Sequence, residues 1–80
     1  MKNVLVIIYD EIAKTWSAPL MFVNMDCAKR YFNQLMNKNE SPTDFRLYQL
    51  GEIDVNAPVL EKVFDLNLNF ICVGEKKAGE

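Results

Sequence analysis

The stretch Asn24-Met-Asp-Cys-Ala-Lys-Arg-Tyr-Phe-Asn-Gln-Leu-Met-Asn-Lys38 decides the fold, because its periodicity is typical of an amphipathic helix. Asn24 is a favourable N-cap, and Asp26 puts a negative charge in the first turn, where the helix dipole stabilises it. Residues at three- and four-residue spacing form an apolar stripe, bordered by Tyr31, that consists of Met25, Ala28, Phe32, Leu35 and Met36. We predict a helix over residues 24–38 that packs this stripe against the rest of the chain.

Short apolar segments on both sides of the helix predict strands. Residues 4–9 are apolar and rich in β-branched side chains on both faces, which is typical of an interior strand. Residues 16–23 predict a second strand, and Pro19, which has no N–H to donate, places that strand at an edge or bends it.

Two further strands are expected after the helix. Residues 45–53 form the third, in which Gly51 indicates a bulge or a close approach of the backbone. Residues 66–73 form the fourth, with Leu68, Phe70 and Cys72 expected on one face together with Leu66.

The expected architecture is therefore a small α+β domain with the order strand, strand, helix, strand, short helix, strand. The four strands form a mostly antiparallel sheet, and the short helix falls within residues 57–65. Eighty residues make one domain, which we place at residues 1–73, followed by a frayed charged tail over residues 74–80.

One helix can cover only one face of this sheet. The first strand is apolar on both faces, with Val4, Val6 and Ile8 on one and Leu5, Ile7 and Tyr9 on the other. The second face needs a cover, which could be the 57–65 segment, strong curvature into a half-barrel, or a second subunit. We favour the second subunit, and so expect a homodimer.

Composition argues against catalysis. The chain has no His, and its two cysteines, Cys27 and Cys72, form neither a disulfide framework nor a zinc signature. No phosphate-binding glycine loop is present, and no base is available to activate Ser17 or Ser41. We expect no enzyme, no metal and no cofactor. No apolar run reaches the length of a membrane span, so we expect a cytoplasmic protein without a membrane partner.

Single-stranded nucleic acid is bound by cations that hold phosphates and by aromatic rings that stack on bases. The net charge of −2 counts against non-specific binding but leaves room for a local patch. Arg46 and Tyr48 share one face of the third predicted strand, as such a patch requires. Tyr9 and Tyr31 are further possible platforms. The candidate nucleic-acid-binding residues are Lys14, Trp16, Lys29, Arg30, Arg46 and Tyr48.

Structural explanations compete with each of these assignments. Arg30 follows Asp26 by four residues, the favourable order for an ion pair within a helix. Trp16 and Tyr48 could be a cross-strand packing pair.

One line of residues carries a family resemblance: Tyr9-Asp10, Ala13, Trp16, Pro19, Asn24, Ala28, Arg30, Phe32, Pro42 and then the stretch from Asp44 to Asp54, Asp-Phe-Arg-Leu-Tyr-Gln-Leu-Gly-Glu-Ile-Asp. Over residues 4–54 the chain resembles the small nonstructural protein of gokushovirus-like phages, family Microviridae, which have single-stranded DNA genomes. The resemblance implies a DNA-binding role, or a role between genome replication and packaging, in the cytoplasm of the infected bacterium. It carries over no binding residue.

Two functional hypotheses follow. The first is a homodimeric phage accessory protein that binds single-stranded DNA, with Lys and Arg on phosphates and Trp16 and Tyr48 on bases. The second is a protein–protein interaction module that binds a viral replication or capsid protein, or a host factor.

Overall fold

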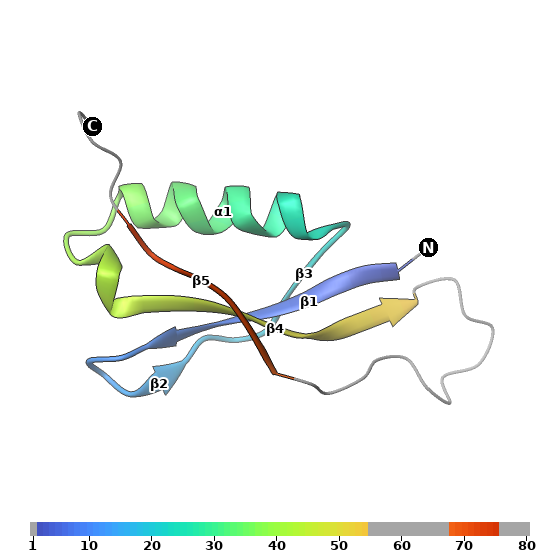
Figure 1. The fold of residues 1–80 in the computed structure, drawn as a ribbon, viewed down its shortest axis with the longest axis horizontal. Helices are drawn as coiled ribbons and strands as arrows, with labels where there is room; N and C mark the ends of the chain where they lie inside the picture. Colours follow the sequence, from blue (N-terminus) through green and yellow to red (C-terminus); the bar gives the residue numbers. More distant parts are fainter. Residues whose placement is uncertain (1, 55–67, 76–80) are drawn as a thin grey trace.

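The computed structural model describes residues 2–54 and 68–75. The elements in chain order are β1 (Lys2–Asp10), β2 (Thr15–Trp16), β3 (Leu20–Phe22), α1 (Met25–Asn37), the 3-10 turn η1 (Pro42–Asp44), β4 (Phe45–Asp54) and β5 (Asn69–Val73). All strand pairs are antiparallel, and α1 lies along one face of the sheet (Figure 1). The predicted α+β class is confirmed. The described part of the chain has five strands in place of the four expected.

The additional strand arises because the expected strand over residues 16–23 is divided in two. β2 and β3 both pair with the same edge of β1, and residues 17–19 separate them. Pro19 cannot donate a ladder hydrogen bond, as the sequence indicated. Ser17 keeps the connection to β1: its N–H donates to the Ile8 carbonyl oxygen (2.8 Å), and its Oγ accepts from the Ile8 N–H (2.9 Å).

The predicted irregularity at Gly51 is confirmed as a bulge between the two central strands. Leu5 lies opposite Gly51 and Val6 lies opposite Gln49, so Leu50 is an extra residue in β4. The order of the sheet is β2-β1-β4-β5, with β3 beside β2 on the same edge of β1.

A second bulge was not predicted, and it changes the faces of β5. Cys72 lies opposite Leu47, whereas Phe70 lies opposite Tyr48, which leaves Ile71 as the extra residue. Leu47 and Tyr48 are neighbours in β4 and point to opposite faces, so Phe70 and Cys72 do as well. The prediction that these two residues share a face was therefore wrong.

The helix agrees closely with its prediction. Asn24 has extended backbone angles, and its side-chain oxygen accepts the N–H of Cys27 (2.9 Å), while Lys38 is the C-cap. The buried side chains that α1 contributes to the core are Ala28, Phe32 and Met36. They pack against Leu47 of β4 and against the predicted face of β1, namely Val4, Val6 and Ile8.

Two residues at the border of the helix stripe lie partly in solvent. Leu35 is 40% exposed, so its assignment to the buried stripe was wrong. Tyr31 is also exposed in part, and its ring contacts that of Phe22 in β3, with 5.4 Å between centroids.

The last described residues are packed against the helix end. Gly74 is buried, and its N–H donates to the carbonyl oxygen of Phe45 (2.8 Å). A Cβ at this position would meet the carbonyl oxygen of Pro42 and the side chain of Met36. The short helix expected within residues 57–65, and most of the expected tail, lie outside the described residues.

Candidate functional site

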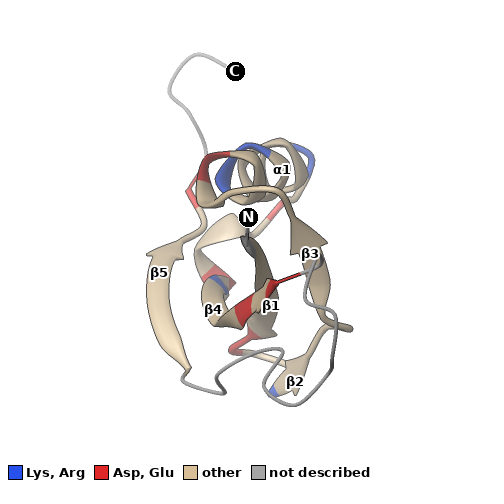
Figure 2. Ribbon diagram, turned by 90° about the vertical axis from the view of Figure 1, so that its right-hand side faces the viewer, with Lys and Arg blue, Asp and Glu red and all other residues tan. Residues whose placement is uncertain are grey.

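The sheet face opposite α1, called the outer face here, is the candidate site. β1 contributes Leu5, Ile7 and Tyr9, the side chains that alternate with its core residues. In the described part of the chain, α1 covers the other face of the sheet and no helix packs on this one (Figure 2). The sheet is strongly twisted. In it, β5 and β2 lie on either side of the central pair, β1 and β4.

Four aromatic rings form a continuous row across the outer face. Successive centroids are separated by 4.5 Å between Tyr9 and Trp16, 5.3 Å between Trp16 and Tyr48, and 5.6 Å between Tyr48 and Phe70. The rings are tilted or edge-on to one another, which is the favourable geometry for aromatic pairs. In this order the rings belong to β1, β2, β4 and β5.

Two of the four rings are open to solvent. Trp16 is 46% exposed and Phe70 is 56% exposed, whereas Tyr9 and Tyr48 are half-buried. Part of the Trp16 and Phe70 side chains therefore remains accessible to a ligand. Cross-strand packing and ligand contact are compatible here, because the packed rings keep part of their surface in solvent.

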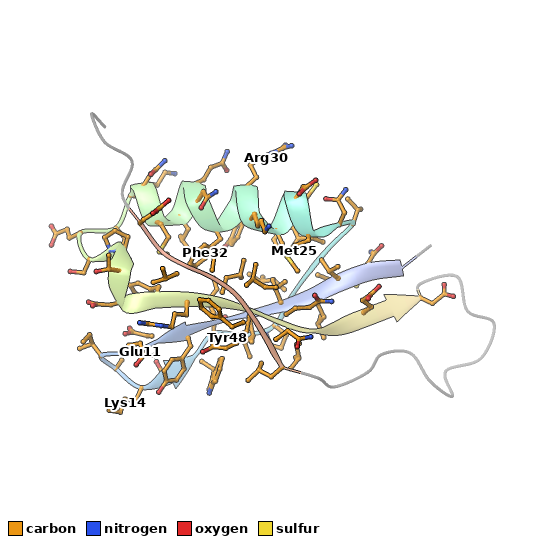
Figure 3. The ribbon with its side chains drawn as sticks, viewed as in Figure 1. Glu11, Lys14, Met25, Arg30, Phe32 and Tyr48 are labelled. Atoms are coloured by element: carbon orange, nitrogen blue, oxygen red, sulfur yellow. The ribbon has the colours of Figure 1, made fainter. Side chains whose placement is uncertain are left out.

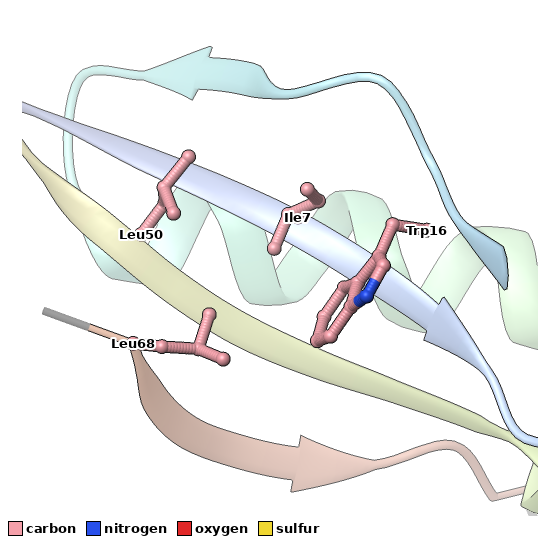
Figure 4. A pocket seen from close by; sticks show the side chains of 4 residues that line it. All are labelled: Ile7, Trp16, Leu50 and Leu68. Carbon is pink, nitrogen blue, oxygen red and sulfur yellow. The ribbon is translucent and has the colours of Figure 1, made fainter. Parts of the chain in front are cut away.

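An apolar groove adjoins the row. Its volume is about 440 Å³, and Ile7, Trp16, Leu50 and Leu68 line it (Figure 4). Leu50 lies two residues after Tyr48 in β4 and so shares its face of the sheet. The groove extends the aromatic row with aliphatic surface.

Arg46 lies at one end of the outer face. It is opposite Tyr9 in the β1–β4 pair, two residues from Tyr48. Its Nη1 lies 3.4 Å from Oε1 of Glu11, and the side chains of Arg46 and Glu11 are 32% and 41% exposed. The charge of Arg46 is thus partly neutralised within the protein.

Lys14 lies in the turn between β1 and β2, at the same end of the molecule as Glu11 (Figure 3). Its side chain is exposed, and its φ of 57° is left-handed. The Asp10 carboxylate orders the turn by accepting the N–H groups of Ile12 (3.0 Å) and Ala13 (3.1 Å).

Lys29 and Arg30 lie on the other layer of the molecule. Both are exposed on α1, and Arg30 points away from the sheet (Figure 3). The structure shows no ion pair between Arg30 and Asp26, although both residues are described. Of the six candidates, the fold brings together Lys14, Trp16, Arg46 and Tyr48 and separates Lys29 and Arg30 from them.

Phe70 is the site residue that the sequence did not suggest. Its strand was predicted, but the bulge at Ile71 was not, and this bulge places Phe70 opposite Tyr48, where its ring extends the row. In the sequence, Leu68 and Phe70 alternate with two asparagines, which indicates a strand with one apolar face. This alternation does not tell which face of the sheet Leu68 and Phe70 occupy.

The cysteines do not form part of this face. Burial raises the pKa of the Cys72 thiol above its ordinary value of 9.0, and the positive charge of Lys29 partly opposes this effect. Cys72 packs against the core beneath α1. Within residues 2–54 and 68–75, no group of three or more His, Cys, Asp or Glu side chains could hold a metal ion.

The fold and the site define a class of protein: a small α+β domain with one sheet face covered by a helix and the other carrying exposed aromatic rings. The chain belongs to the Phage ORF5 protein family, whose model matches residues 3–74. It is therefore a phage protein. Comparison with curated proteins and with solved structures finds no match. None of the described helices has the length and apolar character needed to cross a membrane.

Proposed function

We propose that this phage protein binds single-stranded DNA on the outer face of its sheet, and that its role is binding rather than catalysis. The observation that carries the proposal is the aromatic row, which contains two exposed rings, Trp16 and Phe70. Sheet surfaces with exposed aromatic rings bind unpaired bases by stacking, which tolerates any sequence because every base has a π-face.

The dimensions of the row suit a short stretch of nucleotides. The Trp16 and Tyr48 centroids are 5.3 Å apart and the Tyr48 and Phe70 centroids 5.6 Å apart, so Trp16 and Phe70 lie no more than 10.9 Å apart. Stacked nucleotides advance by about 3.4 Å along one strand. The two exposed rings are therefore at most about three such steps apart, so they can take bases from a stretch of up to about four nucleotides.

The charges near the row indicate that stacking supplies most of the affinity. Lys14 and Arg46 are the cations at its end, and Arg46 already has a carboxylate partner. Each phosphate contact on a single strand contributes a slope of about −0.7 to the dependence of log affinity on log salt. One or two contacts give a slope between about −0.7 and −1.4, which is shallow for a DNA-binding protein.

The sequence resemblance supports the same proposal. It relates residues 4–54 to the nonstructural protein of gokushovirus-like Microviridae, and the Phage ORF5 family match supports a phage origin. A phage with a single-stranded genome needs proteins that hold that strand between replication and packaging. We place this chain in that role, in the cytoplasm of the infected bacterium.

Fluorescence titration with a short oligothymidylate tests the proposal, because Trp16 is the single tryptophan and lies in the site. We expect quenching at low salt and weaker binding at moderate salt. Phe70→Ala should weaken binding by about 1–3 kcal/mol, the value of one stacked base, while leaving the Trp16 signal in place. Tyr31→Ala is the matched control, since it removes a partly exposed ring from the α1 layer.

Three results would contradict this function: no binding by the wild-type protein, binding that is indifferent to salt, or equal losses in Phe70→Ala and Tyr31→Ala. Circular dichroism of both variants shows whether each has folded, so that a loss of binding is not a loss of structure.

A second candidate function is protein–protein interaction through the same face, and the apolar groove favours it. Ile7, Leu50 and Leu68 offer aliphatic surface that stacking on bases does not require. The partner would be a second copy of this chain, or a viral replication or capsid protein. Sedimentation at micromolar concentration tests self-association, and Leu68→Asp should abolish it. A monomer for the wild-type protein would remove the homodimer.

A further inference from the structure

The contact between Glu11 and Arg46 lies within the proposed binding face. Arg46 projects on the outer face opposite Tyr9 and two residues from Tyr48. Its Nη1 is inaccessible to solvent and forms no hydrogen bond of good geometry to the described residues, although Oε1 of Glu11 lies 3.4 Å away. The guanidinium therefore has an anionic neighbour but an incomplete set of hydrogen bonds.

The backbone holds Glu11 in this position. The N–H of Glu11 donates to the carbonyl oxygen of Asp44 (2.8 Å), just before β4 begins. On the other side, the Asp10 carbonyl oxygen accepts the N–H of Lys14 (2.7 Å), and the Asp10 carboxylate accepts two further turn N–H groups. The turn is tied at both ends, so the fold holds the backbone of Glu11 beside the start of β4, within side-chain reach of Arg46.

We propose that the carboxylate of Glu11 occupies the position of a DNA phosphate, and that binding exchanges the one anion for the other. This inference rests on the proposed function. Carboxylate and phosphate oxygens are alternative partners of a guanidinium group, and Arg binds both with the same fork of donors. The contact at 3.4 Å leaves the Nη1 hydrogen bonds of Arg46 incomplete, so a phosphate that completes them can displace Glu11.

Glu11 then competes with the DNA phosphate for Arg46, and this competition lowers the contribution of Arg46 to DNA affinity. With Glu11 in place, Arg46 contributes little net attraction for the backbone, and binding depends on stacking at Trp16 and Phe70. The site discriminates in favour of strands whose bases are unpaired, because a duplex offers phosphates but no free base faces. Without Glu11, the same face would gain a general attraction for phosphates.

The test compares wild-type protein, Glu11→Gln, Arg46→Gln and the double variant, by titration with oligothymidylate at several salt concentrations. Glu11→Gln should bind several-fold more tightly, because a phosphate no longer has to displace the carboxylate from Arg46. Arg46→Gln should remove this gain, so that the double variant resembles Arg46→Gln alone. Arg46→Gln should make the salt slope shallower by about 0.7, the value of one phosphate contact. Glu52→Gln is the matched control, since it removes one exposed carboxylate of β4 far from Arg46.

The outcomes separate this inference from the function on which it rests. If Glu11→Gln and Glu52→Gln behave alike while Phe70→Ala still weakens binding, the competitor role of Glu11 is wrong and DNA binding stands. If neither wild-type protein nor Glu11→Gln binds, both are wrong. If the double variant keeps the gain in affinity seen in Glu11→Gln, the inference is also wrong, because that gain would not depend on Arg46. Glu11→Ala provides a second variant, with folding checked by circular dichroism.

Discussion

Ser17 shows how one side chain can replace a strand residue. It lies between β2 and β3, where Pro19 interrupts the ladder along β1. Its Oγ accepts the half-buried N–H of Ile8 and donates to the carbonyl oxygen of Ala18 (3.1 Å). The hydroxyl therefore satisfies a β1 donor that the divided strand would otherwise leave unpaired.

We expect Ser17→Ala to lower the free energy of unfolding by about 1–2 kcal/mol, because a donor that is partly buried loses its partner. Ser17→Thr keeps the hydroxyl and should retain most of the stability. Urea denaturation followed by far-ultraviolet circular dichroism measures both changes. Equal stability of the wild-type protein and Ser17→Ala would show that solvent satisfies the Ile8 N–H.

At the scale of elements, α1 is determined locally and β5 is not. The N-cap, the acidic first turn and the apolar stripe of the helix all lie within consecutive residues. The cap and the acidic first turn are as predicted, and the stripe packs on the sheet except at Leu35. β5 has a bulge at Ile71 that sets which of its side chains reach the outer face. That bulge arises from the pairing of β5 with β4, and the residues of β5 alone do not predict this pairing.

We expect Asn24→Ala to cost about 1 kcal/mol of stability, since it removes the side-chain acceptor for the Cys27 N–H at the helix start. Asn24→Asp should be close to neutral, because aspartate caps equally well and also complements the helix dipole. Urea denaturation again provides the measurement. The cap would be shown to be dispensable if Asn24→Ala matched Asn24→Asp.

At the scale of the whole molecule, the two layers separate two of the candidate lysines. Lys14 lies at the end of the sheet near Glu11, and Lys29 lies on α1, on the layer that covers the opposite face of the sheet (Figure 2). Solvent-exposed charges interact over about 10 Å at an ionic strength of 0.1 M. Only the nearer lysine should therefore contribute strongly to binding on the outer face.

Removing one positive charge from each layer tests this arrangement. Lys14→Gln should weaken oligothymidylate binding by about two- to fivefold and make the salt slope shallower by about 0.7. Lys29→Gln changes the net charge by the same amount and should leave binding within about twofold of the wild-type protein. Equal losses in both variants would indicate a ligand path that reaches the helix layer.

The sequence by itself determined the helix, its cap, the α+β class and the apolar character of both faces of β1, because each of these depends on residues that are near neighbours in the chain. It also located the irregularities at Pro19 and Gly51, since those residue types restrict or free the backbone wherever they stand. Only the tertiary structure decided that Tyr9, Trp16, Tyr48 and Phe70 form one row, and that Lys29 and Arg30 lie apart from it. The row depends on strand order and on the bulge at Ile71, and both are set by contacts between residues far apart in the chain, which local pattern does not encode.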